Sequence, residues 1–119
     1  MIESMAREDA IKEKILKLGA KQKLGGVLKY ISNPSDEVRV TVAIVLGMIP
    51  TYESGMGLIE LLRDPVPRVR ATAADSAAKI KAKHCEQYVK KLAFADSDPD
   101  VRQIAKRAFD QLKDTVITY

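Results

Sequence analysis

The sequence has few of the residues that enzymes and metalloproteins use for chemistry. It contains no Trp, one His and one Cys, and aromatic side chains make up only 5% of its residues. With the single cysteine Cys85 no intramolecular disulfide can form, so a reducing compartment, the cytoplasm, is the expected location. The scarcity of rings favours closely packed helices with small aliphatic side chains over a core of bulky aromatic residues.

No combination of residues predicts catalysis or a cofactor. His84 and Cys85 are neighbours, but adjacent residues of a helix point about 100° apart and do not face each other. A zinc site needs about four ligands, and no second His or Cys cluster supplies them. Gly55 and Gly57 follow no strand, so they match no phosphate-binding fingerprint. The sequence therefore predicts no enzyme, no metal site and no cofactor.

Long apolar segments are also missing. The longest apolar run, Val40 to Ile49, is interrupted only by Thr41 and is about half the length that spans a bilayer. The N-terminal stretch MIESMAREDAIKEK is charged throughout, so neither a signal peptide nor membrane insertion is expected. The net charge of +4 is mildly basic, which permits contact with acidic partners without requiring it.

The chain does contain a repeated pattern. The dipeptide Val-Arg recurs at intervals of 31 and 32 residues, and five residues before each copy stands an Asn or Asp, with proline in between. The copies are Val38-Arg39, Val69-Arg70 and Val101-Arg102, and the preceding polar residues are Asn33, Asp64 and Asp96. A fixed period between about 20 and 50 residues indicates a stack of repeated supersecondary units.

Each repeat is predicted to be a hairpin of two helices, since apolar residues recur at helical spacing and no segment alternates at period two. Ser35 and Asp98 fit N-caps, and Pro67 and Pro99 fit the first helical position. An amphipathic helix ending at Gly19 precedes the hairpins. The expected helices are 2–18, then the pairs 21–32 with 36–49, 53–63 with 67–83, and 86–95 with 99–113.

The predicted fold is therefore an all-α solenoid of three helical hairpins with an N-terminal capping helix. The chain is expected to form one domain, residues 1–119, because three stacked repeats are about the minimum for stability. Its parts are a capping helix at 1–19, repeats at 20–50, 51–83 and 84–113, and a tail at 114–119.

The second repeat carries the clearest family resemblance. The segment Leu61-Leu62-Arg63-Asp64-Pro65-Val66-Pro67-Arg68-Val69-Arg70, followed by Ala73, Ala74, Ala77 and Ile80, resembles a HEAT repeat. More narrowly, it looks like the short type, about 30 residues long, first associated with phycobilisome lyases. The third repeat departs from the pattern, because Lys90 and Lys91 fall where the second has Leu58 and Ile59. Its apolar face is expected to consist of Val89, Leu92 and Phe94.

The resemblance implies a structural role for the repeated arginines. In HEAT repeats of this kind the Arg after Val pairs with the polar turn residue of its own or an adjacent repeat, and bidentate contacts would fix the angle between hairpins. The alternative, that these arginines bind an anionic ligand, matches their regular recurrence less well. The expected ladder consists of Arg39, Arg70 and Arg102 with Asn33, Asp64 and Asp96.

The first candidate partner-binding surface is the inner row of second helices, where the resemblance places a ligand. The helix from Val38 to Ile49 is apolar nearly all round, which normally means burial on every side. The alternative is an exposed strip that the repeat register continues into the later helices. The partner-binding residues predicted on this basis are Val40, Ile44, Met48, Asp75, Lys79 and Arg107.

The second candidate surface is a run of basic residues between repeats two and three. One interpretation is a solvated helix end, where lysines favour the C-terminal dipole. The other is contact with an acidic protein, nucleic acid or anionic lipid. The run begins at Lys79, and the residues predicted to contact an anionic partner are Lys81, Lys83, His84, Lys90 and Lys91.

These observations favour a non-catalytic protein-interaction or scaffolding module. The main alternative is an accessory protein that binds nucleic acid through the lysine-rich edge, with an affinity that falls steeply with salt. A chaperone-like role on a chromophore follows only from the family name and from no residue of this chain.

Overall fold

The computed structural model describes residues 2–116, and every regular element in that range is helical, which confirms the all-α prediction. The helices are α1 (Ile2–Ala20), α2 (Leu24–Leu28), α3 (Asp36–Leu46), α4 (Tyr52–Leu61), α5 (Pro67–Lys79), the 3-10 helix η1 (Lys83–Cys85), α6 (Glu86–Ala95) and α7 (Pro99–Lys113).

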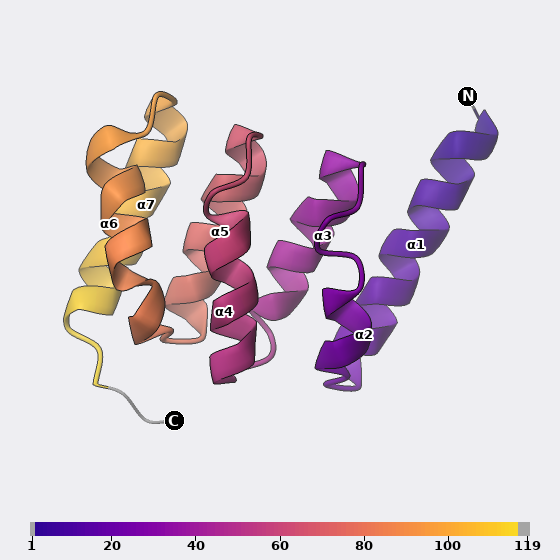
Figure 1. The fold of residues 1–119 in the computed structure, drawn as a ribbon, viewed down its shortest axis with the longest axis horizontal. Coiled ribbons are helices and arrows are strands. Elements are labelled where there is room, and N and C mark those ends of the chain that lie inside the picture. Colours follow the sequence, from indigo (N-terminus) through magenta and orange to yellow (C-terminus); the bar gives the residue numbers. More distant parts are fainter. Residues whose placement is uncertain (1, 117–119) are drawn as a thin grey trace.

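The helices lie in two layers, and in Figure 1 the layer of α2, α4 and α6 lies in front of the other. One layer, here called the inner row, consists of α1, α3, α5 and α7, each packed against the next. The other, the outer row, consists of α2, α4 and α6, which pack on the inner row and touch one another little. The result is a flat solenoid of 44 × 32 × 16 Å. Because only the inner row is continuous, grooves open between the helices of the outer row.

Small side chains let the inner helices approach closely. On α5, Ala73, Ala74 and Ala77 are fully buried, as their position in the repeat predicts. The Ser76 hydroxyl donates a hydrogen bond to the Ala43 carbonyl of α3, at 2.6 Å. Such a contact joins a short side chain of α5 directly to the backbone of α3 and requires small residues at the crossing.

The helix starts follow the predicted signals. The Ser35 hydroxyl accepts from the Val38 N–H at 3.3 Å, and the Asp98 carboxylate accepts from Val101 N–H at 3.2 Å. Pro67 and Pro99 begin α5 and α7, where the missing N–H leaves no hydrogen bond unmade. Side-chain caps and prolines therefore define these boundaries in the sequence itself.

The predicted end of the first helix is wrong. Gly19 lies inside α1, and the helix closes instead on Gln22, a non-glycine residue with φ of 56°. The Lys23 N–H donates to the Leu18 carbonyl and the Gln22 N–H to the Gly19 carbonyl, both at 2.9 Å, which is a Schellman motif. Gly19 serves close packing, since a Cβ there would lie 2.3 Å from Cγ1 of Val45.

Three predicted helices, by contrast, are too long. The first helix of repeat one is only α2 followed by turns, and α3 ends at Leu46 rather than residue 49. Gly25 and Gly26 weaken α2, because glycine costs about 1 kcal/mol in a helix relative to alanine. Helix α5 ends at Lys79 in a second Schellman motif, with Lys81 at φ of 55°, and η1 follows.

The apolar face predicted for the third repeat is wrong at one position. Val89 and Leu92 are buried, but Phe94 is 65% exposed and meets Phe109 edge-on, with ring centroids 6.2 Å apart. The equivalent residue of repeat two, Leu62, is buried between α4 and α6. Phe94 is open because no hairpin stacks on α6 and α7 within residues 2–116.

Candidate partner-binding surfaces

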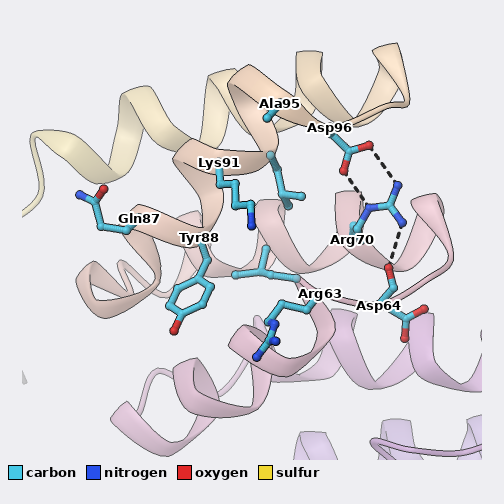
Figure 2. A pocket seen from close by; sticks show the side chains of 10 residues that line it. Arg63, Asp64, Arg70, Gln87, Tyr88, Lys91, Ala95 and Asp96 are labelled. Carbon is cyan, nitrogen blue, oxygen red and sulfur yellow. Dashed lines mark hydrogen bonds and ion pairs between the residues drawn. The ribbon is translucent and has the colours of Figure 1, made fainter.

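The repeated arginines and aspartates form a hydrogen-bonded ladder. The Nε and Nη2 atoms of Arg39 donate to the two carboxylate oxygens of Asp64, at 2.7 and 3.1 Å. Arg70 holds Asp96 in the same way, at 2.8 and 3.0 Å, as Figure 2 shows. Each arginine thus reaches forward to the turn of the following repeat.

Each arginine also binds its own turn. The Nη1 atom of Arg70 donates to the Asp64 carbonyl at 2.9 Å, and that of Arg39 donates to the Asn33 carbonyl at 2.8 Å. One guanidinium therefore connects two successive turns. The bonds are bidentate and charge-assisted, which makes them geometrically specific.

The ends of the ladder differ from its middle. Among residues 2–116 no ladder arginine of a preceding repeat pairs with Asn33, and the Asn33 side chain is uncharged. Arg102 donates to the Asp96 carbonyl at 2.6 Å, and within residues 2–116 no carboxylate follows that would complete its fork. The turn residue is thus an aspartate in the two repeats where an arginine of the preceding repeat pairs with it, and an asparagine in the first repeat.

The ladder alters the acidity of its carboxylate. Burial alone would raise the pKa of Asp96, but hydrogen bonds from Arg70 and the Asp98 N–H, with the nearby charges of Arg70 and Arg102, lower it below its usual value of 3.8. The hydrogen bonds that Arg70 donates to the Asp96 carboxylate are in turn the main reason why the pKa of Arg70 is raised. Both groups stay charged and paired near neutral pH, so neither is available to a ligand.

The predicted inner strip is partly exposed. Ile44 and Met48 are 42% and 51% exposed, although most of α3 is buried. Asp75 and Lys79 lie on the surface of α5 and form an ion pair at 3.2 Å, and Arg107 is exposed on α7. By the repeat offset Ile44, Asp75 and Arg107 occupy equivalent positions on three neighbouring helices.

Val40 requires a correction. It was predicted to contact a partner, but it is only 5% exposed. Helix α3 has α1 on one side and α5 on the other, with α2 and α4 packed on it from the outer row. Val40 is therefore a core residue, and the exposed apolar part of the strip is limited to Ile44 and Met48.

Two residues of the predicted basic surface are occupied by structural contacts. The Lys83 ammonium donates to the Leu112 and Lys113 carbonyls, both at 2.9 Å, and so caps the C-terminus of α7. The His84 ring stacks on Tyr52 with centroids 4.3 Å apart, and its Nε2 lies 3.0 Å from the Tyr52 carbonyl. Lys83 therefore joins η1 to the last helix, and His84 joins η1 to α4 of repeat two.

The remaining lysines of that surface face different neighbours. Lys79 pairs with Asp75 on the inner row, and Lys90 lies over the Phe109 ring of α7, 5.8 Å from its centroid. Lys91 lines a groove towards α4. Lys79, Lys90 and Lys91 are thus close in the sequence but contact three different parts of the surface. Lys81 is exposed in the turn after α5.

The single cysteine is a packing residue. Cys85 is fully buried, and its Sγ donates to the Gly55 carbonyl at 3.3 Å. Burial raises the pKa of the Cys85 thiol to about 12, so it stays protonated at neutral pH and is a poor nucleophile. Among residues 2–116 no group of three or more His, Cys, Asp or Glu side chains could hold a metal ion. In the same range no helix is long and apolar enough to cross a membrane.

The sequence did not predict a groove between α4 and α6, which has a volume of about 760 Å³. Arg63, Tyr88 and Lys91 border it, and its surface includes Leu62 and Leu92 (Figure 2). The signal was present as the lysine at the repeat position of Ile59. That lysine indicated that the third repeat turns a different side of its first helix to the core. It did not indicate a groove, because the side chains of α4 that face it are distant in the sequence.

A family model for HEAT repeats matches residues 22–110, from the turn after α1 to within α7. The model describes HEAT repeats in general, so the short, phycobilisome-lyase-like type stays a prediction. HEAT repeats generally serve as protein-interaction scaffolds, and the family is generally non-enzymatic. No curated protein matches the chain.

Proposed function

We propose, since this chain belongs to the HEAT-repeat family, that it is a non-catalytic module that binds a partner protein along its inner row of helices. The supporting observation is the exposure of Ile44 and Met48 at 42% and 51% on the otherwise buried α3. Exposure of large apolar side chains to water is unfavourable. A partner that covers them stabilises the complex by about 25 cal/mol per Å² of apolar surface removed from water. We further propose an intracellular adaptor role in the cytoplasm, consistent with the unpaired Cys85.

The chemistry of the row suggests what such a partner presents. The α3 part of the row is apolar, whereas the equivalent positions on α5 and α7 are Asp75 and Arg107. A suitable partner segment carries an apolar side chain opposite Ile44 and Met48 and an acidic one opposite Arg107. The ladder holds the three helices at fixed angles, so little conformational entropy is lost on binding.

The test begins with capture of partners from native lysate on the purified chain, followed by titration with the captured protein after its own purification. Ile44→Asp replaces an exposed apolar side chain with a charge, and should weaken binding while the melting temperature stays that of the parent. Met56→Asp is the matched control, because Met56 is 49% exposed on α4 of the outer row. Equal affinities of the parent and Ile44→Asp would contradict the proposal.

The second candidate is a nucleic-acid-binding accessory protein. It is supported by the net charge of +4 and by Lys81, Lys90 and Lys91, which are exposed. Neutralised phosphates release counterions, so this function requires that the logarithm of the binding constant for duplex DNA or RNA fall linearly with the logarithm of salt concentration. A salt titration with the Lys81→Glu variant distinguishes it from binding at the inner row.

A further inference from the structure

The outer row has an open groove on the face opposite the inner strip. It lies between α4 and α6, which touch each other little, whereas α5 and α7 behind them stay in contact. Its volume of about 760 Å³ lies within the range of roughly 300 to 1,000 Å³ typical of ligand sites. Its exposed apolar surface comes from Ala95 and from Tyr88, which is 40% exposed (Figure 2). Leu62 and Leu92 also line the groove but are only 2% and 8% exposed.

Two cations border this groove from opposite sides. Arg63 follows α4 and Lys91 belongs to α6; both are exposed, and neither forms an ion pair with another group of residues 2–116. The groove also contains the carboxylates of Asp64 and Asp96, but each is already held by a ladder arginine. Its two outer cations are therefore left without a neutralising carboxylate.

The neighbouring groove of the outer row has a different character. It lies between repeats one and two and has a volume of about 330 Å³. Its lining shares Arg63 but adds Glu60, whose carboxylate accepts a hydrogen bond from Ser32 at 3.5 Å. The excess of positive charge thus belongs to the groove between α4 and α6. Its origin in the sequence is Lys91, which replaces the aliphatic Ile59 of the preceding repeat.

From this arrangement we infer that the groove between α4 and α6 binds an acidic peptide segment of a partner protein. Carboxylate side chains of the segment meet Arg63 and Lys91, and an apolar side chain between them covers the exposed Tyr88 and Ala95. Guanidinium groups bind carboxylates in a bidentate manner, and tyrosine and arginine are enriched among residues that dominate binding. A nucleic-acid strand fits less well, because stacking platforms for successive bases need several aromatic side chains and Tyr88 is the one in the lining.

This site is separate from the inner strip. It lies on the other row of helices, so the module can hold two partners, or two segments of one partner, at once. Variants at Arg63 and Lys91 leave Ile44 and Arg107 untouched, and failure at one surface does not imply failure at the other.

The experiment is nuclear magnetic resonance titration of the isotope-labelled full chain with a peptide of alternating Glu and Leu. The expected result is a set of saturable amide shift changes centred on Arg63, Tyr88 and Lys91. The same peptide with Gln in place of Glu should bind at least about tenfold more weakly, because it lacks the charge-assisted bonds. The double variant Arg63→Gln/Lys91→Gln should lose affinity for the acidic peptide to the same extent.

The matched control is Arg7→Gln/Lys14→Gln, which removes an arginine and a lysine from the exposed surface of α1. It should bind the acidic peptide like the parent chain. Three results would overturn the inference: no binding of the acidic peptide at millimolar concentration, shift changes confined to α3 or to the turn at Lys81, or equal loss of affinity in the control. Tighter binding of single-stranded DNA than of the peptide, lost in the Arg63→Gln/Lys91→Gln variant, would reassign the groove to nucleic acid.

Discussion

At the residue scale, the ladder arginine connects levels of structure that are usually separate. Arg70 closes its own turn through the Asp64 carbonyl and holds the next turn through the Asp96 carboxylate. A single guanidinium thus couples local turn geometry to the stacking of repeats. Lysine could not replace it, because an ammonium group lacks the planar fork that serves both acceptors.

Replacement of one ladder arginine should destabilise the fold measurably. Arg70→Ala leaves the nearly buried Asp96 carboxylate with only its backbone donor, and should lower the free energy of unfolding by about 1–3 kcal/mol. Arg102→Ala is the matched control, since Arg102 binds a carbonyl but no carboxylate of residues 2–116. Urea denaturation of both variants is the measurement. Equal midpoints for Arg70→Ala and the parent would contradict the structural role.

The acidity of Asp96 gives a prediction with a definite sign. Its pKa is lower in the folded chain than the ordinary value of 3.8, so its ion pair stabilises the fold fully above that value. This contribution should disappear as pH falls below 3.8 and through the folded pKa. Asp96→Asn should therefore lower stability at neutral pH and reduce the loss on acidification, as followed by thermal melts between acidic and neutral pH. A parent chain and a variant with parallel pH profiles would show that Asp96 is not the titrating group.

The resemblance to HEAT repeats implied which residues form the ladder, and the spacing that recurs three times located them in this chain. It left open whether each arginine pairs with its own turn or the adjacent one, since both lie within reach of a long side chain. The structure has both, with different acceptor atoms. Burial of Val40 was not predictable from periodicity, because a helix apolar on all sides gives no indication of which side stays exposed.

At the element scale, close packing explains two glycines with opposite demands. A Cβ at Gly19 would lie 2.3 Å from Cγ1 of the buried Val45, whereas a Cβ at Gly25 would meet nothing within 4 Å. Gly19→Ala should lower the melting temperature, because α1 and α3 must separate. Gly25→Ala should raise stability by about 0.5–1 kcal/mol through helix propensity. Calorimetric melts of the pair test this, and a stabilising Gly19→Ala would show that α1 does not pack as described.

The alanine face gives a second prediction at this scale. Ala73→Leu and Ala77→Leu should each destabilise the chain by about 1–3 kcal/mol, because both positions are fully buried and the added atoms overpack the helix crossing. Ala6→Leu, at an exposed position of α1, is the control and should melt like the parent. If all three variants melt alike, the register of α5 against its neighbours is wrong.

Helix starts were more predictable than helix ends. Starts depend on residues with a strong local effect, such as the Ser35 and Asp98 caps or Pro67. The ends of α1 and α5 are set by Gln22 and Lys81 in the left-handed region, which neither residue type favours. Tertiary packing decides these ends. The helix predicted at 2–18 therefore stopped too early, at Gly19, whereas the helix predicted at 67–83 continued too far.

At the scale of the whole molecule, the two layers differ in packing. The inner row is continuous and joined by the ladder, and it is the surface on which we propose that a partner binds. The outer row is interrupted, which creates the groove at Arg63 and Lys91. The repeat period predicted the solenoid, because stacked units contact mainly their neighbours. It could not predict surfaces that depend on side chains facing each other across two repeats.

The separation of the lysine cluster follows from the same geometry. Lys83 and His84 turn inwards at the junction of repeats, whereas Lys90 and Lys91 are about 100° apart on α6 and face α7 and α4. Charge density along a sequence therefore overstates charge density on a folded surface when the segment crosses a turn and enters a helix.

The most direct test of the binding function is titration calorimetry of a purified partner with four forms of the chain. Ile44→Asp and Arg107→Glu should each weaken binding by more than about 1 kcal/mol without unfolding the protein, because interface energy is concentrated in few residues. Lys81→Glu, at the exposed turn after α5, should bind like the parent. Loss of binding in Lys81→Glu with normal binding by both inner-row variants would contradict the account and place the site at the basic edge.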